Sequence, residues 1–325
     1  MNDKQFDILV VGELNVDLIL NQIEGTPVLG KEVFSRDMVM TLGSSSAIFA
    51  NNLSVLGTRV SFFGRVGQDN FADLVCSSLQ KSGVDISNLI HSSKSNTGIT
   101  VAMSYGEDRA MVTYPGAMSD LTVSDIKDDD LRKAKHLHIS SIFLQEGLLP
   151  EVHLLFARAK KLGLTTSLDP QWDPTENWAV DLAQLLPNVD IFLPNEAELM
   201  NMTGTTSISE GMAVILPYCN HVVVKQGVKG ATLYSEGIHI KEPAILNKNI
   251  VDAIGAGDSF NAGFIHAFLQ DQPLTSCLET GIVTGAMSTT AAGGTGAFTS
   301  RKEVSDLAIN KYNFKLKDRL SEEKV

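Results

Sequence analysis

The residues best suited to carry chemistry lie in one short segment, Val251–Gly263, which reads VDAIGAGDSFNAG. Its glycine-rich turn, Gly255–Ala256–Gly257, leads into a predicted helix that begins near Asp258. Glycines let successive backbone N–H groups converge on one point, and a helix N-terminus adds partial positive charge. Such an anion hole would stabilise a transferring phosphoryl group, and Asp258 beside it would take a proton from an attacking hydroxyl. The structural alternative is that Asp258 only caps the helix after a tight turn.

The bulk composition is that of an ordinary soluble globular protein, with 325 residues, 43% of them hydrophobic and 20% charged. No basic block offsets the net charge of −12, so we expect no nucleic-acid partner and no membrane partner. The three cysteines are far apart and form no Cys-x-x-Cys pair, which fits a reducing compartment. The segment Met1–Phe6 does not read as a signal peptide, and no apolar run is long enough for a bilayer. We therefore expect a cytoplasmic protein.

The elements that must position the glycine-rich turn alternate between short apolar strands and helices. Strands are predicted at Phe6–Val11, Val60–Phe63, His136–Ser140, Thr165–Leu168, Ile191–Leu193 and His221–Val224. Helices are predicted between them, for example at Ala47–Leu56, Phe71–Lys81 and Leu148–Leu162. This alternation favours parallel crossover units, and hence an α/β fold with a doubly wound, Rossmann-like parallel sheet and helices on both faces. We expect a single domain over residues 1–325.

Two segments, at about residues 14–40 and 97–118, interrupt this alternation because they look extended and turn-rich. The second predicts paired strands, Gly98–Ser104 and Ala110–Tyr114, around the turn Tyr105–Asp108. Such excursions from an α/β core commonly form a lid over a site. We therefore expect a small β-strand lid, whose open edge would suit a homodimer.

The segment Asp252-x-x-Gly255–Ala256–Gly257–Asp258 resembles the C-terminal signature of the ribokinase/PfkB carbohydrate kinases. Four more motifs resemble that family and occur in the expected order: Gly12–Asp17, the N-terminal signature from Gly43 to Asp69, Pro194–Glu198, and Lys225-x-Gly227-x-x-Gly230. The resemblance covers almost the whole chain and implies a ribokinase-like fold. It also implies transfer of the γ-phosphoryl group of Mg·ATP to a hydroxyl of a sugar, sugar acid or related polyol.

The resemblance further implies a role for each matched residue. The catalytic set would be the base Asp258 and the anion-hole residues Gly255, Ala256 and Gly257. The set for Mg·ATP would be Asn195 and Glu198 near Mg²⁺, acting through water, and Lys225, Gly227 and Gly230 near the phosphates. The set for the substrate would be Asn15, Asp17, Gly43, Ser44 and Ile48. Asp252 would border a candidate monovalent-cation site. In the lid, Arg109 would suit a carboxylate or phosphate, or would be a solvated hairpin charge.

The N-terminal signature departs from the family pattern at two positions. Ser44 replaces the second glycine, and Ile48 replaces the asparagine that usually faces the sugar. Ile48 removes one partner for a hydroxyl and adds an apolar wall, so we expect a substrate less hydroxylated than ribose, or one whose hydroxyls are placed differently. Ile254 and residues 289–296 do not clearly reproduce the monovalent-cation ligands.

Three other functions remain as alternatives. A nucleoside kinase of the same family would use Ile48 as part of a base-binding wall. A catalytically idle sugar sensor would keep the scaffold, although the intact Asp258 argues against it. A dehydrogenase is more distant, since its G-x-G-x-x-G fingerprint would need glycine where Phe260 stands. Two further features are structural interpretations: His136 and His138 as core or edge histidines, and Asp169 as a residue bordering the crevice.

Overall fold

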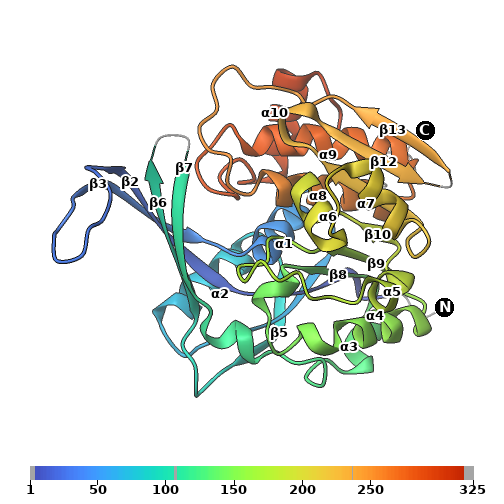
Figure 1. The fold of residues 1–325 in the computed structure, drawn as a ribbon, viewed down its shortest axis with the longest axis horizontal. Helices are drawn as coiled ribbons and strands as arrows, with labels where there is room; N and C mark the ends of the chain where they lie inside the picture. Colours follow the sequence, from blue (N-terminus) through green and yellow to red (C-terminus); the bar gives the residue numbers. More distant parts are fainter. Residues whose placement is uncertain (1–3, 106–107, 236, 318–325) are drawn as a thin grey trace.

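The computed structural model describes residues 4–105, 108–235 and 237–317, with a large sheet at its centre (Figure 1). Within the described residues, nine strands form this sheet in the order β13-β12-β11-β10-β9-β8-β1-β4-β5. The strands from β5 to β11 pair in parallel, and β12 and β13 add an antiparallel edge. Their bounds are β1 Phe6–Val11, β4 Val60–Val66, β5 Asp85–His91, β8 Ala134–Ser140, β9 Thr165–Asp169, β10 Ile191–Phe192, β11 His221–Lys225, β12 Ala231–Ser235 and β13 Ile238–Glu242. The predicted doubly wound α/β fold is confirmed.

Helices cover both faces of the sheet, and each face has its own hydrophobic core (Figure 1). Alternate residues of β1 divide between the cores, since Ile8 and Val10 belong to one and Leu9 and Val11 to the other. The first core packs against α1 Ser45–Val55, α2 Asn70–Lys81, α8 Ala256–Leu269, α9 Leu274–Ser288 and α10 Arg301–Tyr312. The second packs against α3 Asp128–Arg132, α4 Val152–Lys161, α5 Leu182–Leu185, α6 Glu196–Thr203 and α7 Ile208–Ile215. Among the described residues, we find no helix with the length and hydropathy needed to cross a membrane.

The strand order reverses between β1 and β8, and this reversal determines where a ligand would bind. From β1 the chain winds through β4 to β5 on one side, then returns through β8 to β11 on the other. In doubly wound sheets, ligands bind outside the carboxyl ends of the strands at such a reversal. Glu13 follows β1, Asp169 ends β9, Asn195 follows β10 and Lys225 ends β11. These polar residues therefore lie along one edge of the sheet.

A second, smaller sheet projects from the main body and contains the extended segments (Figure 1). In the described part of the chain it has four strands in the order β3-β2-β6-β7. Their bounds are β2 Asn15–Ile23, β3 Ser35–Leu42, β6 Gly98–Tyr105 and β7 Asp108–Tyr114. The predicted hairpin strands are present, while residues 106 and 107 of the predicted turn lie outside the described residues. This four-stranded sheet, which we call the lid sheet, connects to the core through Gly43 and the start of α1.

The two histidines of β8 belong to the core. His136 and His138 are fully buried, and both rings bond to the Ser167 hydroxyl of β9, at 2.6 and 2.7 Å. Burial lowers the pKa of His136 to about 3 and the pKa of His138 well below its usual range. Over the described ranges, no group of three or more His, Cys, Asp or Glu side chains could hold a metal ion. The prediction of core histidines is confirmed.

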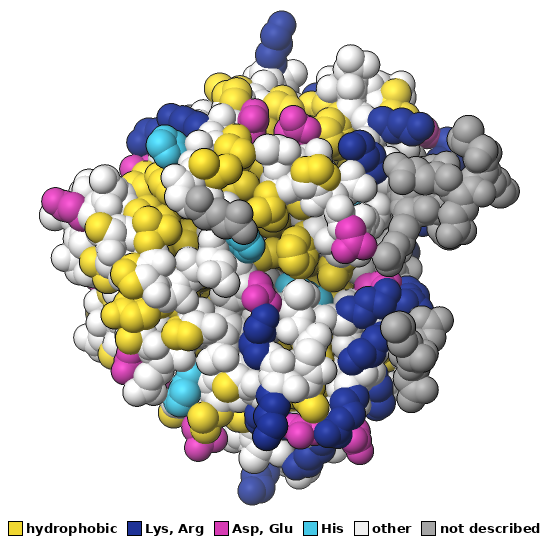
Figure 2. Space-filling model, turned by 90° about the vertical axis from the view of Figure 1, so that its right-hand side faces the viewer, with side chains coloured by type: hydrophobic (Ala, Val, Ile, Leu, Met, Phe, Trp, Pro, Cys, Tyr) yellow, Lys and Arg dark blue, Asp and Glu magenta, His cyan; other side chains and the backbone are white. Residues whose placement is uncertain are grey.

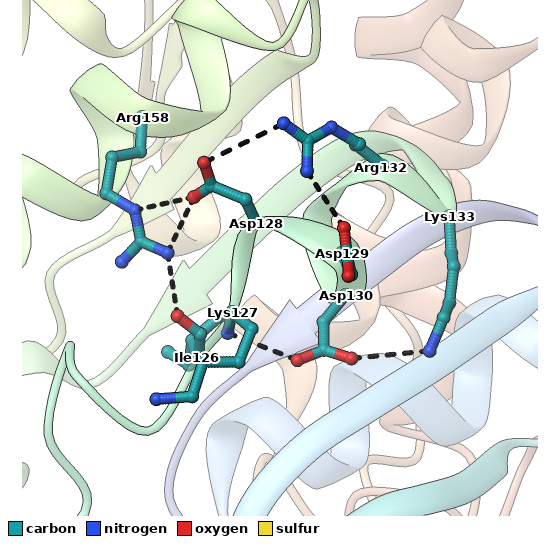
Figure 3. Close-up of polar contacts among 8 residues, drawn as sticks. All are labelled: Ile126, Lys127, Asp128, Asp129, Asp130, Arg132, Lys133 and Arg158. Carbon is teal, nitrogen blue, oxygen red and sulfur yellow. Dashed lines mark hydrogen bonds and ion pairs between the residues drawn. The ribbon is translucent and has the colours of Figure 1, made fainter.

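The surface remote from the lid sheet carries many cationic side chains, which gather in the lower part of Figure 2. Several cations in the described residues pair with carboxylates, as Arg59 and Lys135 do with Asp7 at 3.0 and 2.8 Å. Figure 3 shows a similar cluster, in which Arg158 of α4 donates to Asp128 of α3 at 3.0 and 2.8 Å. These contacts fix the short helix α3 against α4.

Candidate active site

The glycine turn before α8 is a conformation that only glycine adopts easily. Gly255 caps the helix with a φ of 72°, in the left-handed region. A Cβ there would lie 2.5 Å from the Cα of Gly294 and 3.2 Å from Cγ2 of Ile48. Gly257, two residues on, has open space instead: apart from its chain neighbours and the adjacent backbone of α8, the described atom nearest to its ideal Cβ is Nζ of Lys225, at 3.8 Å. The first N–H groups of α8 therefore border a space that faces a lysine.

Asp258 lies in the first turn of α8 and is 6% exposed. Its Oδ1 accepts a hydrogen bond from Nε2 of Gln171 at 3.0 Å. Burial raises the pKa of Asp258 well above its usual range, and the neighbouring Asp169 raises it further, while Lys225 opposes both. A buried carboxyl with a raised pKa beside a helix N-terminus is a good proton acceptor for a hydroxyl.

Lys225 at the end of β11 pairs with Asp169 at the end of β9, with Nζ 2.8 Å from Oδ2. Burial alone would lower the pKa of Lys225, but the carboxylates of Asp169 and Glu198 outweigh it and raise that pKa. Asn261 of α8 also donates to Asp169 Oδ2. The lysine thus lies between the strand ends and the open side of Gly257, with its charge fixed in place.

Asn195 and Glu198 form a capping box at the start of α6. Oε2 of Glu198 accepts from the Asn195 backbone N–H at 2.8 Å, and Oε1 accepts from its side-chain amide at 2.6 Å. Burial, reinforced by Asp169, raises the pKa of Glu198 to about 7. The carboxylate oxygens of Glu198 and the amide oxygen of Asn195 are hard donors of the kind that Mg²⁺ prefers, and Mg²⁺ usually keeps several of its waters when one or two such groups bind it together with phosphate oxygens.

The predicted substrate residues cluster where the lid sheet meets the core. Nδ2 of Asn15 donates to Asp17 Oδ1 at 3.0 Å and to the Thr100 hydroxyl of β6 at 2.9 Å. Burial raises the pKa of Asp17 to about 6, although a hydrogen bond from Asn15 and the charge of Arg109 oppose the rise. A Cβ on Gly43 would lie 2.3 Å from Asp17 Oδ1, so the lack of a side chain at Gly43 lets the Asp17 carboxylate approach the main chain.

The two departures from the family pattern both have structural partners. Ser44 caps α1 through the Ala47 N–H at 2.9 Å and donates to the carbonyl of Glu13 at 2.6 Å. Ile48 is 3% exposed and packs against Gly294, whose Cβ would lie 2.5 Å from Ile48 Cδ1. Ile48 therefore supports the loops around the glycine turn.

Three of the predicted residues, Asp252, Gly227 and Gly230, stabilise the main chain of loops in this structure. Asp252 accepts the N–H of Ile254 and the N–H of Gly293, both at 2.9 Å, and so ties two loops together. Gly227 and Gly230 have positive φ values in the β11–β12 connection. A Cβ on Gly230 would lie 1.9 Å from the carbonyl oxygen of Glu242, so this turn requires glycine.

Sequence reasoning missed Gln171, Asn261 and Glu13 as parts of the site. Glu13 is 2% exposed and accepts from the backbone N–H of Ser46 at 3.1 Å and from its hydroxyl. Burial raises the pKa of Glu13 to about 7. The available signal was position: Glu13 follows a buried strand, Gln171 follows another by two residues, and Asn261 lies within the glycine-rich motif.

These features define a class of site. A buried carboxylate at a helix N-terminus, a glycine turn with open space and a fixed lysine meet beyond the carboxyl ends of β9 and β11 in a doubly wound sheet. These features are typical of a phosphotransferase, which needs a proton acceptor for the nucleophile and a fixed positive potential around the transferred phosphoryl group.

Comparisons with known proteins agree with that class. The family model described as pfkB family carbohydrate kinase matches residues 5–301, so the chain belongs to this family. The ribokinase of Lactococcus lactis subsp. lactis (strain IL1403) is 26% identical over 310 residues, 94% of this chain and 99% of that protein. The 5-dehydro-2-deoxygluconokinase of Geobacillus thermodenitrificans (strain NG80-2) is 28% identical over 293 residues, 86% of each chain. The structure of Arabidopsis thaliana ribokinase complexed with ribose and ATP matches with a TM-score of 0.79 at 24% identity, covering 93% of this chain and 98% of that one.

Two predictions are thereby confirmed. The fold is ribokinase-like, and the chain is a phosphotransferase with an alcohol group as acceptor.

Proposed function

We propose that this kinase transfers the γ-phosphoryl group of Mg·ATP to a hydroxyl of a sugar, sugar acid or related polyol, with Asp258 as the general base. The observation that carries the proposal is the position of Asp258 in the first turn of α8, buried and next to the open side of Gly257. A hydroxyl near Asp258 would lose its proton while the phosphoryl group rests on the helix N-terminus.

The nucleotide would approach from the side of β11 and the glycine turn. Lys225 lies 3.8 Å from the ideal Cβ of Gly257, close enough to meet an oxygen of a phosphate bound at the turn. The amides of Gly255, Ala256 and Gly257 would stabilise charge on that phosphate. Gly227 and Gly230 would border the nucleotide further out.

Asn195 and Glu198 would hold Mg²⁺ through its water ligands. When bound, the ion neutralises the phosphates and orients them for in-line attack. A monovalent cation near Asp252 remains a prediction; both oxygens of this carboxylate already accept backbone N–H groups.

The acceptor would lie between the core and the lid sheet. Asn15 and Asp17 would bind its hydroxyls, and Gly43 and Ser44 would hold the connecting turn in place. Asp17 would accept hydrogen bonds once ionised. Arg109 interacts electrostatically with Asp17 and would reach a substrate group from the lid. Closure of the lid would exclude water and limit ATP hydrolysis.

We also propose that the lid sheet forms a homodimer contact. Large apolar side chains are exposed on its strands, among them Met38 and Met40 of β3 and Met111 and Val112 of β7. Exposed apolar patches of this kind mark interaction sites. Light scattering should find a dimer for the native chain and a monomer after Met111→Glu with Val112→Glu; a native monomer would contradict this part of the proposal.

A coupled ADP-release assay tests the proposed reaction. Mg·ATP is supplied with a panel of hexoses, ketoses, sugar acids, polyols and nucleosides, and Asp258→Asn is assayed beside the native protein. We expect turnover of a sugar-like acceptor that falls by roughly 10²–10⁴-fold in the variant. Asp306→Asn in α10 is the matched control, since it makes the same Asp-to-Asn change at an exposed position outside the proposed site. Preference for a nucleoside would favour the nucleoside kinase alternative, and binding of sugar and ATP without product would favour the sensor.

A further inference from the structure

The side-chain amide of Gln171 connects the proposed base, Asp258, to Asp169, the carboxylate that pairs with Lys225. Nε2 of Gln171 lies 3.0 Å from Oδ1 of Asp258 and 2.9 Å from Oδ2 of Asp169. Asp169 Oδ2 also accepts from Lys225 at 2.8 Å and from Asn261. Asp169 is fully buried, and its Oδ1 has no hydrogen-bond partner in the described part of the chain. All three donors therefore converge on one oxygen.

The loop that carries Gln171 holds it in an unusual backbone conformation. Gln171 has a φ of 60°, although left-handed conformations are uncommon for residues other than glycine. The loop beyond it is closed by Asp173, which accepts from the Thr175 N–H at 2.8 Å and the Trp178 N–H at 2.7 Å. A non-glycine residue held in this region, with its side chain turned toward two carboxylates, is a built feature of the site.

We infer that Gln171, anchored by Asp169, is the residue that positions the carboxylate of Asp258 to take the proton of the acceptor hydroxyl as that hydroxyl attacks the γ-phosphoryl group. The inference rests on the proposed function of Asp258. The hydrogen bond from Gln171 holds Oδ1 of Asp258 in place, so that the other lone pairs of the carboxylate are directed at the acceptor hydroxyl. A neutral amide does this without adding a charge that would compete with Lys225 for the phosphate.

The charges around Asp258 make such a donor necessary. Burial, Asp169 of β9 and Glu13 beyond β1 disfavour its ionised form, while Lys225 of β11 and the Ser45 hydroxyl of α1 favour it. A hydrogen bond to the ionised form adds to the favourable side. Removing the amide and removing the Asp169 charge should therefore act in opposite directions on the pKa of Asp258.

Three variants separate this role from simple support of the loop. Gln171→Leu removes the bridge, and Asp169→Asn keeps the shape of the anchor but removes its charge. Asp173→Asn is the matched control, since it weakens the same loop without a contact to Asp258. We expect Gln171→Leu to lower kcat about 10–100-fold with little change in KM for ATP, as expected for a misplaced group. Asp173→Asn should lower the Tm and leave the pH dependence of kcat/KM unchanged.

The pH dependence gives the decisive readout. The acidic limb of the kcat/KM profile should move to higher pH in Gln171→Leu and to lower pH in Asp169→Asn. Carboxyl ¹³C NMR titration of Asp258 measures the same shifts without turnover, so it decides the inference even if no acceptor is phosphorylated. A native protein without kinase activity would contradict the proposed function. An unmoved pKa in Gln171→Leu, or shifts of the same sign in both variants, would overturn the role of Gln171.

Discussion

The open side of Gly257 allows a prediction in which stability and function change in opposite directions. In Gly257→Ala the new methyl group would lie 3.8 Å from Lys225 Nζ, an ordinary van der Waals distance, and this is its nearest described contact beyond its chain neighbours and the adjacent backbone of α8. Gly257 lies within α8 and its φ is not positive, so alanine fits the backbone. Alanine is favoured over glycine in helices by roughly 0.5–1 kcal/mol. The free energy of unfolding should therefore stay level or rise by up to about that amount.

Function should be lost in the same variant. A phosphate oxygen bonded to Lys225 would lie about 2.8 Å from Nζ. The new methyl group, 3.8 Å from the same Nζ, would compete with a phosphate that binds between the turn and this lysine. Displacing the phosphoryl group from its amide donors should lower kcat/KM by about 10²–10³-fold, the effect of losing one such donor. The affinity for Mg·ATP should fall as well.

Two measurements on the same preparation check this prediction. Urea unfolding gives the stability, and equilibrium binding of Mg·ATP with the ADP-release assay gives the function. Gly255→Ala is the contrasting variant, since its φ of 72° and a Cβ 2.5 Å from Gly294 should destabilise the fold itself. Native kcat/KM in a stable Gly257→Ala protein would refute the assignment of this turn as the anion hole.

The remaining predictions concern other residues of the site. Gly43→Ala would place a methyl group 2.3 Å from Asp17 Oδ1, so steady-state kinetics should show KM for the acceptor rising about 10-fold or more with KM for ATP unchanged. Ile48→Asn should lower the free energy of unfolding by roughly 1–3 kcal/mol, measured in urea, because it buries an amide against Gly294. The same variant should shift acceptor preference toward more hydroxylated sugars; an unchanged preference would contradict the predicted role of Ile48. Glu13 has a folded pKa of about 7 against roughly 4.3 unfolded, so its contribution to stability is fully present below about pH 4.3 and is lost as pH rises through 7. Glu13→Gln should therefore flatten the dependence of unfolding free energy on pH between about 4 and 8, and a slope equal to that of the native protein would count against this account.

The parallel core could be predicted because its strands are apolar on both sides. β1 was predicted with its observed bounds, Phe6–Val11, since every residue from Ile8 to Val11 is buried. The strands β5, β12 and β13 were missed. The strands β5 and β13 are half-exposed and carry polar residues, such as those in Asp85–His91, whereas β12 is mostly buried but has only five residues. Edge strands of this kind lack the apolar run that identifies a central strand.

Helix starts were predicted less well than helix positions. The predicted helix Leu148–Leu162 is in fact a 3₁₀ turn at Leu149–Glu151 followed by α4 from Val152. Pro150 explains the difference, because it cannot donate the backbone hydrogen bond that would continue an α-helix through it.

The catalytic motif could be predicted, but its supporting contacts could not. Asp258 and Gly255 stand in a contiguous pattern whose chemistry follows from residue type. Gln171 acts through a left-handed backbone conformation in an irregular loop, 87 positions away from Asp258. No periodicity marks such a contact, because it depends on how β9 and α8 meet in space rather than on local sequence.

The distribution of charge explains why this site uses so many neutral donors. Glu13, Asp169, Glu198 and Asp258 are all nearly buried, and Lys225 is the cation that contacts this group directly among the described residues. A second lysine beside Asp258 would stabilise its anion so strongly that it would become a weaker base. The amides of Gln171 and of the helix N-terminus orient the carboxylate and the phosphate with a smaller loss of basicity, because they carry no net charge. The acidic neighbours keep Asp258 basic, and the neutral donors keep it ordered, so the two features are needed together.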